Sequence, residues 1–154
     1  MESKYLERAI ELAKLSIDNG GGPFGAVIVK DGKIIAEASN SVTKDNDPTA
    51  HAEVNCIRKA CSELGTFVLE GCDIYASSEP CPMCFGAIYW AYIDRIFYAG
   101  TREDAAWGGF DDDFIYKEIA TQPTSRRVPA VNALQPEGRQ VFAVWRGKAD
   151  KIDY

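Results

Sequence analysis

The chain has one histidine in 154 residues, so any chemistry that needs an imidazole depends on His51. No apolar run approaches the roughly 20 residues that span a bilayer. Charges are threaded through the amino-terminal stretch MESKYLERAIELAKL, which a signal peptide would keep apolar. These absences predict a cytoplasmic protein with no membrane partner.

Positive charge is also scarce. Lysine and arginine total 17 against 23 acidic residues, for a formal charge of -6. A protein that grips nucleic acid usually carries a basic patch, because neutralising backbone phosphates supplies most of the affinity. We therefore expect a small neutral ligand and no nucleic-acid partner.

Five cysteines cannot form a closed set of disulfides, because the number is odd. In a reducing compartment, cysteines that cluster in sequence more often bind metal or take part in chemistry. Cys81 and Cys84 are such a pair. Cys56, Cys61 and Cys72 have no partner at ligand spacing, and we expect them to be buried as small apolar side chains.

Apolar residues make up 46% and charged residues 26% of the chain, close to ordinary globular usage. The length suits one domain, residues 1–154. Helices are predicted over residues 5–17, 50–64, 83–93 and 138–154, and strands over residues 24–30, 33–38, 72–78 and 95–100. Asp31-Gly32 is a strong hairpin signal, and Thr49 after Pro48 is the expected N-cap of the second helix. The alternation predicts an α/β fold with helices packed on a central sheet.

The motif PCPMC places Cys81 and Cys84 at the start of a helix, where the helix dipole and unpaired backbone N–H groups favour thiolates. His51 stands in the equivalent first turn of another helix. Two helix amino termini meeting above the sheet would bring one nitrogen and two sulfurs onto one Zn²⁺. Three protein ligands leave a fourth position open, which is typical of a catalytic zinc site.

Alternatives to this metal site have to be weighed. A His-x-Glu tripeptide on its own occurs by chance in many sequences. A Cys-x-x-Cys pair on its own is as consistent with a redox pair or with half of a structural zinc site as with a catalytic one. A closed structural site needs a fourth ligand, but Cys56 lies about 140° around the helix axis from His51. A redox pair would leave His51 and Glu53 unexplained.

Zinc held by one imidazole and two thiolates can lower the pKa of its water from 15.7 to around 7, which supplies a zinc-bound hydroxide as nucleophile. Glu53, in the same turn as His51, is placed to carry the proton of that water. His-x-Glu followed by Pro-Cys-x-x-Cys is the signature of zinc deaminases. The motif therefore predicts that water adds to an amidine-like carbon of a nucleobase and that ammonia leaves.

Four blocks make the resemblance more particular: GGPFGAVIVKDG, NDPTAHAEV, EPCPMCFGAIYWA and GFDDDFIYKEI. Together they resemble the bacterial guanine deaminases of the cytidine-deaminase fold, over residues 20–119. The last block is the one that points to guanine. The resemblance implies a three-layer α/β/α sandwich with a mixed central sheet of about five strands. It also implies zinc-dependent hydrolysis of guanine to xanthine and ammonia.

When the functional residues of that family are matched to this sequence by position, the resemblance implies that His51, Cys81 and Cys84 are the zinc ligands. It implies that Glu53 is the proton shuttle. It makes Asp112 a second acid that contacts the guanine ring and helps move a proton to the departing amine. Asp111 and Asp113 stay open as alternatives to Asp112, because the run of three aspartates allows a shift by one. A solvated helix start would also explain such a run.

The implied substrate-binding residues are Asn40, Phe24, Trp90, Ala52 and Tyr154. Asn40 matches an asparagine that hydrogen-bonds the purine, while Phe24 and Trp90 match aromatic positions of the base pocket or belong to the core. Tyr154 matches a carboxyl-terminal tyrosine that closes over a pocket, either its own or a neighbour's. The resemblance also implies a homodimer, in which the carboxyl-terminal segment is a candidate for exchange.

Other functions stay open. Alternative substrates are guanosine, an aminated triazine, cytosine or cytidine, a riboflavin-pathway pyrimidine and adenosine in tRNA. The acidic balance disfavours tRNA, and the aspartate-rich block disfavours pyrimidines. A non-catalytic zinc module, whose metal only holds the fold, is the alternative from another class.

Overall fold

The first two strands form the hairpin that the sequence predicts. In the computed structural model, which describes residues 2–154, β1 (Gly25–Lys30) pairs antiparallel with β2 (Lys33–Ser39). The two turn residues both have positive φ, 50° at Asp31 and 72° at Gly32. This turn type matches the right-handed twist of the strands that it joins.

The central sheet has the strand order β2-β1-β3-β4 and is mixed. β3 (Cys72–Ser78) runs antiparallel to β1 and parallel to β4 (Arg95–Gly100). The sheet therefore has four strands, and the expected number of about five is wrong. After β4, Thr101 caps α5 (Arg102–Trp107) by accepting the Asp104 N–H, and no strand follows within residues 101–154.

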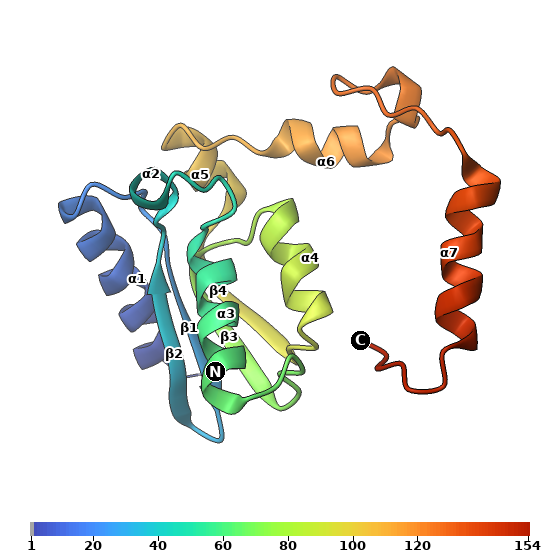
Figure 1. Ribbon diagram of the computed structural model, residues 1–154. Coiled ribbons are helices and arrows are strands. Elements are labelled where there is room, and N and C mark those ends of the chain that lie inside the picture. The colour runs from blue at the N-terminus through green and yellow to red at the C-terminus, as the bar shows by residue number, and fades with distance from the viewer. Residues whose placement is uncertain (1) are drawn as a thin grey trace. The chain divides into compact units, whose positions relative to one another are not determined.

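Helices cover both faces of this sheet, as expected for a three-layer α/β/α sandwich (Figure 1). α1 (Ser3–Asp18) packs on one face, where Tyr5, Ala9 and Leu12 meet Val27, Val29 and Tyr75. α3 (Ala52–Leu64) and α4 (Pro82–Trp90) pack on the other face. Successive β1 side chains point to opposite faces, so one strand serves both layers.

Two of the three cysteines outside the Cys-x-x-Cys pair, Cys56 and Cys72, are buried in the core between the sheet and α3. Cys61 is half-buried and packs against the same core. The Cys56 thiol donates to the carbonyl of Ala36 over 3.3 Å, and burial raises its pKa to about 12. These three side chains are therefore packing residues, as predicted.

The start of α3 differs from the expectation. His51 occupies the N-cap position, and Thr49 instead bonds the Asp47 carboxylate through both its N–H and its hydroxyl. The polar loop before it contains the short helix α2 (Val42–Asp45). α3 ends where predicted, at Gly65, whose φ of 65° suits glycine.

The chain forms two compact units, one up to Asp113 and the other Phe114–Tyr154. The second unit contains most of α6 (Asp113–Ala120), the 3₁₀ turn η1 (Pro123–Ser125) and α7 (Gln135–Gly147). The sequence predicts a closing helix over residues 138–154; α7 confirms the helix, but it begins three residues earlier and ends at Gly147. One domain over residues 1–154 stays a prediction. Within residues 2–154, no helix is both long and apolar enough to cross a membrane.

Candidate active site

Two helix starts supply the histidine and the first cysteine. His51 is the N-cap of α3 and Cys81 is the N-cap of α4, each with extended backbone. Neither side chain caps its own helix, so both can reach the same point. Pro82 at the first helical position of α4 is preorganised for this start and lacks the N–H that would otherwise be unpaired. Cys84 follows in the first turn and is buried.

The three ligand atoms are spaced as zinc requires. His51 Nδ1 lies 3.5 Å from Sγ of Cys81 and 3.5 Å from Sγ of Cys84. All three atoms lie within 4.8 Å of one another. Zinc bond lengths and tetrahedral angles imply about 3.6 Å between a ligand nitrogen and a ligand sulfur. The donor set therefore fits Zn²⁺ and leaves the fourth corner of the tetrahedron for a non-protein ligand.

Without metal, the ligands hold their protons unequally. The hydrogen bond with Cys84 lowers the pKa of Cys81, and the neighbouring His51 lowers it further. The same pairing with Cys81, together with burial and the nearby Glu53, raises the pKa of Cys84. The hydrogen bond with Cys81 raises the pKa of His51. A metal ion binding here has to displace the proton of Cys84.

Glu53 is the buried carboxyl of the site, with only 6% of its surface exposed. Its Oε2 accepts a hydrogen bond from the Cys84 thiol over 3.4 Å. Burial raises the pKa of Glu53, because a carboxylate loses its water shell there. A carboxyl held in this way beside the open metal position can accept a proton and return it.

The three consecutive aspartates, Asp111 to Asp113, differ in their contacts and burial. The Asp111 carboxylate accepts the N–H of Asp113 over 3.0 Å and so forms the turn that leads into α6. Asp112 is the one whose pKa is raised, first by burial and then by the negative charge of Cys81. Asp112 is half-buried, whereas Asp111 is exposed.

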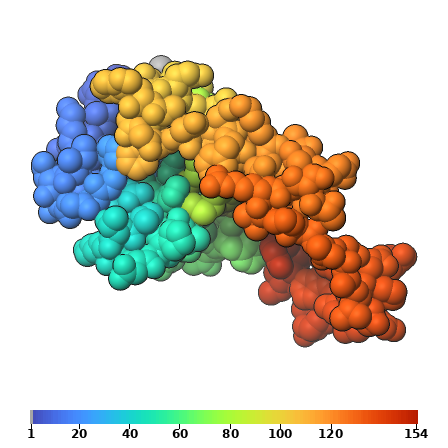
Figure 2. All heavy atoms as spheres, turned by 90° about the horizontal axis from the view of Figure 1, so that it is seen from above, coloured from blue at the N-terminus to red at the C-terminus, as the bar shows by residue number. Residues whose placement is uncertain are grey.

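Asn40 and Phe24 lie at the open end of the β1–β2 hairpin. The Asn40 N–H donates to the Phe24 carbonyl over 3.0 Å, and the Asn40 Oδ1 accepts the N–H of Val42 over 3.2 Å. The Phe24 ring packs edge-on against Phe110 at 5.0 Å. The elements around them, α2 and α5, lie at one end of the sheet (Figure 1), and Figure 2 views the first unit from that end.

Ser16 is a supporting residue that the sequence reasoning missed. Its buried hydroxyl donates to the Asn40 carbonyl over 3.2 Å. The sequence pattern that could have identified Ser16 is a polar residue on the apolar face of the first helix. Gly21 lies against both residues, because a Cβ there would come within 2.4 Å of Ser16 Oγ and 2.8 Å of the Asn40 carbonyl oxygen.

The remaining predicted substrate residues differ in placement. Ala52 has no exposed surface and opens α3, so its backbone N–H in the first turn is the group that can face a ligand. Trp90 ends α4, six residues beyond Cys84 or about 9 Å along the helix axis, and is 67% exposed. Tyr154 belongs to the second unit and is 71% exposed. Contact of these three residues with a base stays a prediction.

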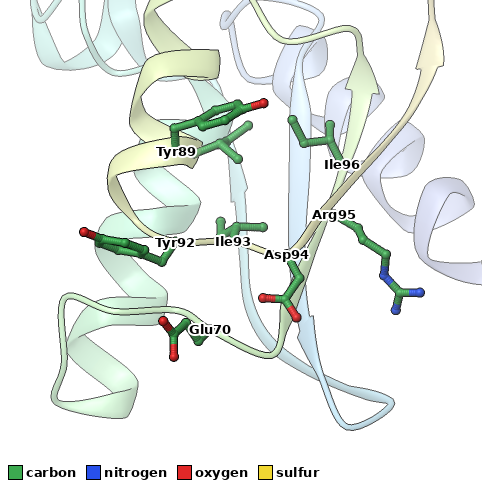
Figure 3. A pocket seen from close by; sticks show the side chains of 8 residues that line it. Glu70, Tyr89, Tyr92, Ile93, Asp94, Arg95 and Ile96 are labelled. Carbon is green, nitrogen blue, oxygen red and sulfur yellow. The ribbon is translucent and has the colours of Figure 1, made fainter.

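A separate pocket of about 620 Å³ lies at the same end of α4 as Trp90. Figure 3 shows the Tyr89 ring directed toward Ile96, while Tyr92 points away. The remaining lining residues are Glu70, Ile88, Ile93, Asp94 and Arg95. None of the predicted site residues lines this pocket.

The fold and the metal-ligand geometry define a zinc-dependent deaminase, and comparison with known proteins agrees. The chain belongs to the cytidine and deoxycytidylate deaminase family, whose zinc-binding region matches residues 1–100. It is 54% identical to the guanine deaminase of Bacillus subtilis (strain 168) over 97% of both chains. The crystal structure of guanine deaminase from Bacillus subtilis superposes with a TM-score of 0.97 at 53% identity, covering 100% of this chain and 99% of that one.

A tRNA-specific adenosine deaminase of Aquifex aeolicus (strain VF5) is more distant. It is 41% identical over 78% of this chain and 76% of its own length.

Proposed function

We propose that this protein is a guanine deaminase that hydrolyses guanine to xanthine and ammonia. The observation that carries the proposal is the three-ligand site of His51, Cys81 and Cys84, with the buried Glu53 against it. The identity of 54% over 97% of both chains supports guanine as the base.

The protein's own residues divide the work. His51, Cys81 and Cys84 would hold a zinc ion, which would lower the pKa of a bound water to about 7 and so supply the attacking hydroxide. Glu53 accepts a proton from that water and returns it to the substrate ring. Asp112 contacts the guanine ring and helps pass a proton to the departing amine. Asn40, Phe24 and the N–H of Ala52 hold and orient the base.

Adenosine in tRNA is the substrate class that the charge disfavours most, since a formal charge of -6 repels a polyanion. Guanosine and aminated triazines are closer alternatives, and they differ from guanine in the space needed around the ring. A site that hydrogen-bonds substrate N–H groups can reject analogues lacking them by about 10⁴ to 10⁵.

The test is ammonia release from guanine by the zinc-loaded protein, run beside guanosine, adenine, cytosine and cytidine. Glu53→Gln is the blank, and Glu63→Gln, an exposed change on the same helix, is the matched control. Guanine turnover that is lost in the first variant and kept in the second supports the proposal. Turnover of another substrate with guanine inert overturns the substrate, and turnover of none favours a structural zinc site.

We also propose that the protein is a cytoplasmic homodimer with exchanged carboxyl-terminal segments. Its five free cysteines suit a reducing compartment. The outer side of α4 exposes Phe85, Tyr89 and Trp90, and α7 exposes Val141, Phe142 and Val144. Large apolar side chains exposed together on one helix are typical of protein interfaces.

Light scattering after gel filtration tests the dimer, and mixing two inactive variants tests the exchange. Glu53→Gln supplies an intact tail and an inactive core, while a variant lacking residues 135–154 supplies an intact core and no tail. Activity on co-refolding the two requires that a tail serve the neighbouring core. A mixture that stays inactive, although both variants are folded and dimeric, contradicts exchange.

A further inference from the structure

Asn55 lies in the second turn of α3, and neither the metal site nor the apolar core accounts for its side chain. Its Nδ2 is 2.9 Å from the Ser41 hydroxyl, 3.1 Å from the Ser39 carbonyl and 3.2 Å from the Ala50 carbonyl. Two of these partners are carbonyl oxygens, which only accept, so the facing atom has to be the amide nitrogen. Its two hydrogens serve three acceptors, and one hydrogen is therefore shared.

The three acceptors flank two residues of the site. Ser39 and Ser41 stand immediately before and after Asn40, and Ala50 stands immediately before His51. The Ser41 N–H also donates to the Ala50 carbonyl over 2.9 Å. The loop from Asn40 to Ala50, which contains α2 (Figure 1), therefore begins and ends next to residues that bind the Asn55 side-chain amide.

Apart from the bond between its Oδ1 and the Val42 N–H, the hydrogen bonds of Asn40 come from Phe24 and from α1. Its N–H is bound by the Phe24 carbonyl and its carbonyl by the Ser16 hydroxyl. Asn55 also joins the two neighbours of Asn40 to α3, the helix whose start carries His51 and Glu53. The Asn55 N–H also donates to the His51 carbonyl over 2.9 Å, so the backbone of Asn55 is bonded directly to that of the metal ligand.

We infer that Asn55 is a positioning residue that fixes the base-binding Asn40 relative to the metal ligand His51. This inference rests on the proposed function, in which Asn40 hydrogen-bonds the purine ring while the metal site supplies the nucleophile. Without the Asn55 side chain, the two ends of the loop would be joined to each other only by the backbone hydrogen bond between Ser41 and Ala50. Without this contact the loop would hold Asn40 less firmly for binding the base, and a loss of uniform binding raises KM while kcat stays unchanged.

Asn55→Asp is the sharpest test, because the two side chains have nearly the same shape. The aspartate presents an oxygen where the amide donated, and that oxygen faces the carbonyls of Ser39 and Ala50. Asn55→Ala is the second variant, since it removes the donors without adding repulsion. Lys59→Ala is the matched control: its Nζ donates to the Glu37 carbonyl over 3.1 Å and so ties the same helix to the same strand, away from the loop.

The measurements are steady-state kinetics with guanine, zinc content, and hydrogen exchange of the amides over residues 40–51. We expect both Asn55 variants to keep one zinc per chain and to exchange faster across that loop. We expect their KM to rise about tenfold or more while kcat changes by less than about threefold, because ground-state placement of the base is what the tie secures. The Lys59→Ala variant should keep the wild-type KM and the wild-type exchange in the loop.

Unchanged exchange over residues 40–51 in Asn55→Asp would overturn the inference. So would a rise in KM no larger than that of Lys59→Ala. Because hydrogen exchange needs no turnover, a wild-type protein that is inert toward guanine overturns the proposed substrate without deciding the role of Asn55.

Discussion

The Glu53 carboxyl accepts a hydrogen bond from the Cys84 thiol, with 3.4 Å between Oε2 and Sγ. Glu53 is therefore in contact with a metal ligand while standing outside the three-residue ligand group. This arrangement separates metal binding from proton transfer, and mutations can separate them as well.

Glu53→Gln should retain zinc and lose about 10² to 10⁴ in kcat, the usual contribution of a positioned acid or base. The amide oxygen can still accept from Cys84, so the ligand geometry should persist. Zinc content by atomic absorption and turnover of guanine check the two parts of this expectation. Loss of zinc together with activity would show that Glu53 serves the metal rather than the proton.

The same substitution should stabilise the metal-free protein at neutral pH. Burial raises the folded-state pKa of Glu53, so the folded state binds this proton more tightly than the unfolded state does. Stability then falls as pH rises from the unfolded pKa through the folded pKa, and the loss is absent below the unfolded pKa. Thermal unfolding of metal-free Glu53→Gln should give a higher midpoint than wild type at pH 7 and a smaller difference near pH 4. A difference that grows on acidification would contradict this sign.

Zinc uptake by the metal-free protein should release at least one proton at pH 7. Cys84 is the source, because its pKa is raised by its pairing with Cys81, by burial and by Glu53, while zinc binds the thiolate. Calorimetric titrations in buffers of different ionisation enthalpy count the protons. Affinity for zinc should therefore weaken as pH falls. A proton count near zero would mean that both thiols are already ionised in the metal-free site.

Asp112→Asn should lower kcat/KM for guanine by about 10²-fold, if this carboxyl moves a proton in the reaction. Asp111→Asn is the matched control, because an amide oxygen can still accept the Asp113 N–H that Asp111 holds. Its activity should stay within about threefold of wild type, since a turn contact of this kind is worth on the order of 1 kcal/mol in stability. The reverse order of effects would assign the second acid to Asp111.

Local patterns in the sequence predict most of the first unit, because hydrophobic periodicity and turn residues act over a few positions. The Asp31-Gly32 turn and the C-cap at Gly65 are examples that the structure confirms. The N-cap of α3 is different: Thr49 is a good capping residue, yet tertiary contacts leave it bonded to Asp47 and start the helix at His51. The expected fifth strand came from resemblance rather than from any β-rich segment, and the structure lacks it.

Local sequence patterns also predict the metal-ligand residues, but they do not predict contacts that depend on tertiary structure. His51, Cys81 and Cys84 carry their chemistry in their residue types, and two helix starts were enough to bring them together. Spacing along the chain does not distinguish Asp111 from Asp112, because the difference lies in burial and in which carboxylate accepts the Asp113 N–H. The contacts of Asn55 join three backbone segments, and no local pattern reports such a junction.

Tyr154 offers the test of whether the carboxyl-terminal segment completes a site. Tyr154→Ala should raise KM for guanine or abolish turnover if the ring closes over the base. The neighbouring Asp153→Ala, which removes the partner of Lys151 in the same tail, is the control and should leave KM unchanged. Because Tyr154 is 71% exposed in a single chain, an effect on KM requires that the tail find a binding surface, on its own core or on a neighbour's. Mixing Tyr154→Ala with Glu53→Gln distinguishes the two, since activity returns only when one chain's tail serves the other's core. Kinetics of Tyr154→Ala equal to wild type would leave the tail outside the reaction.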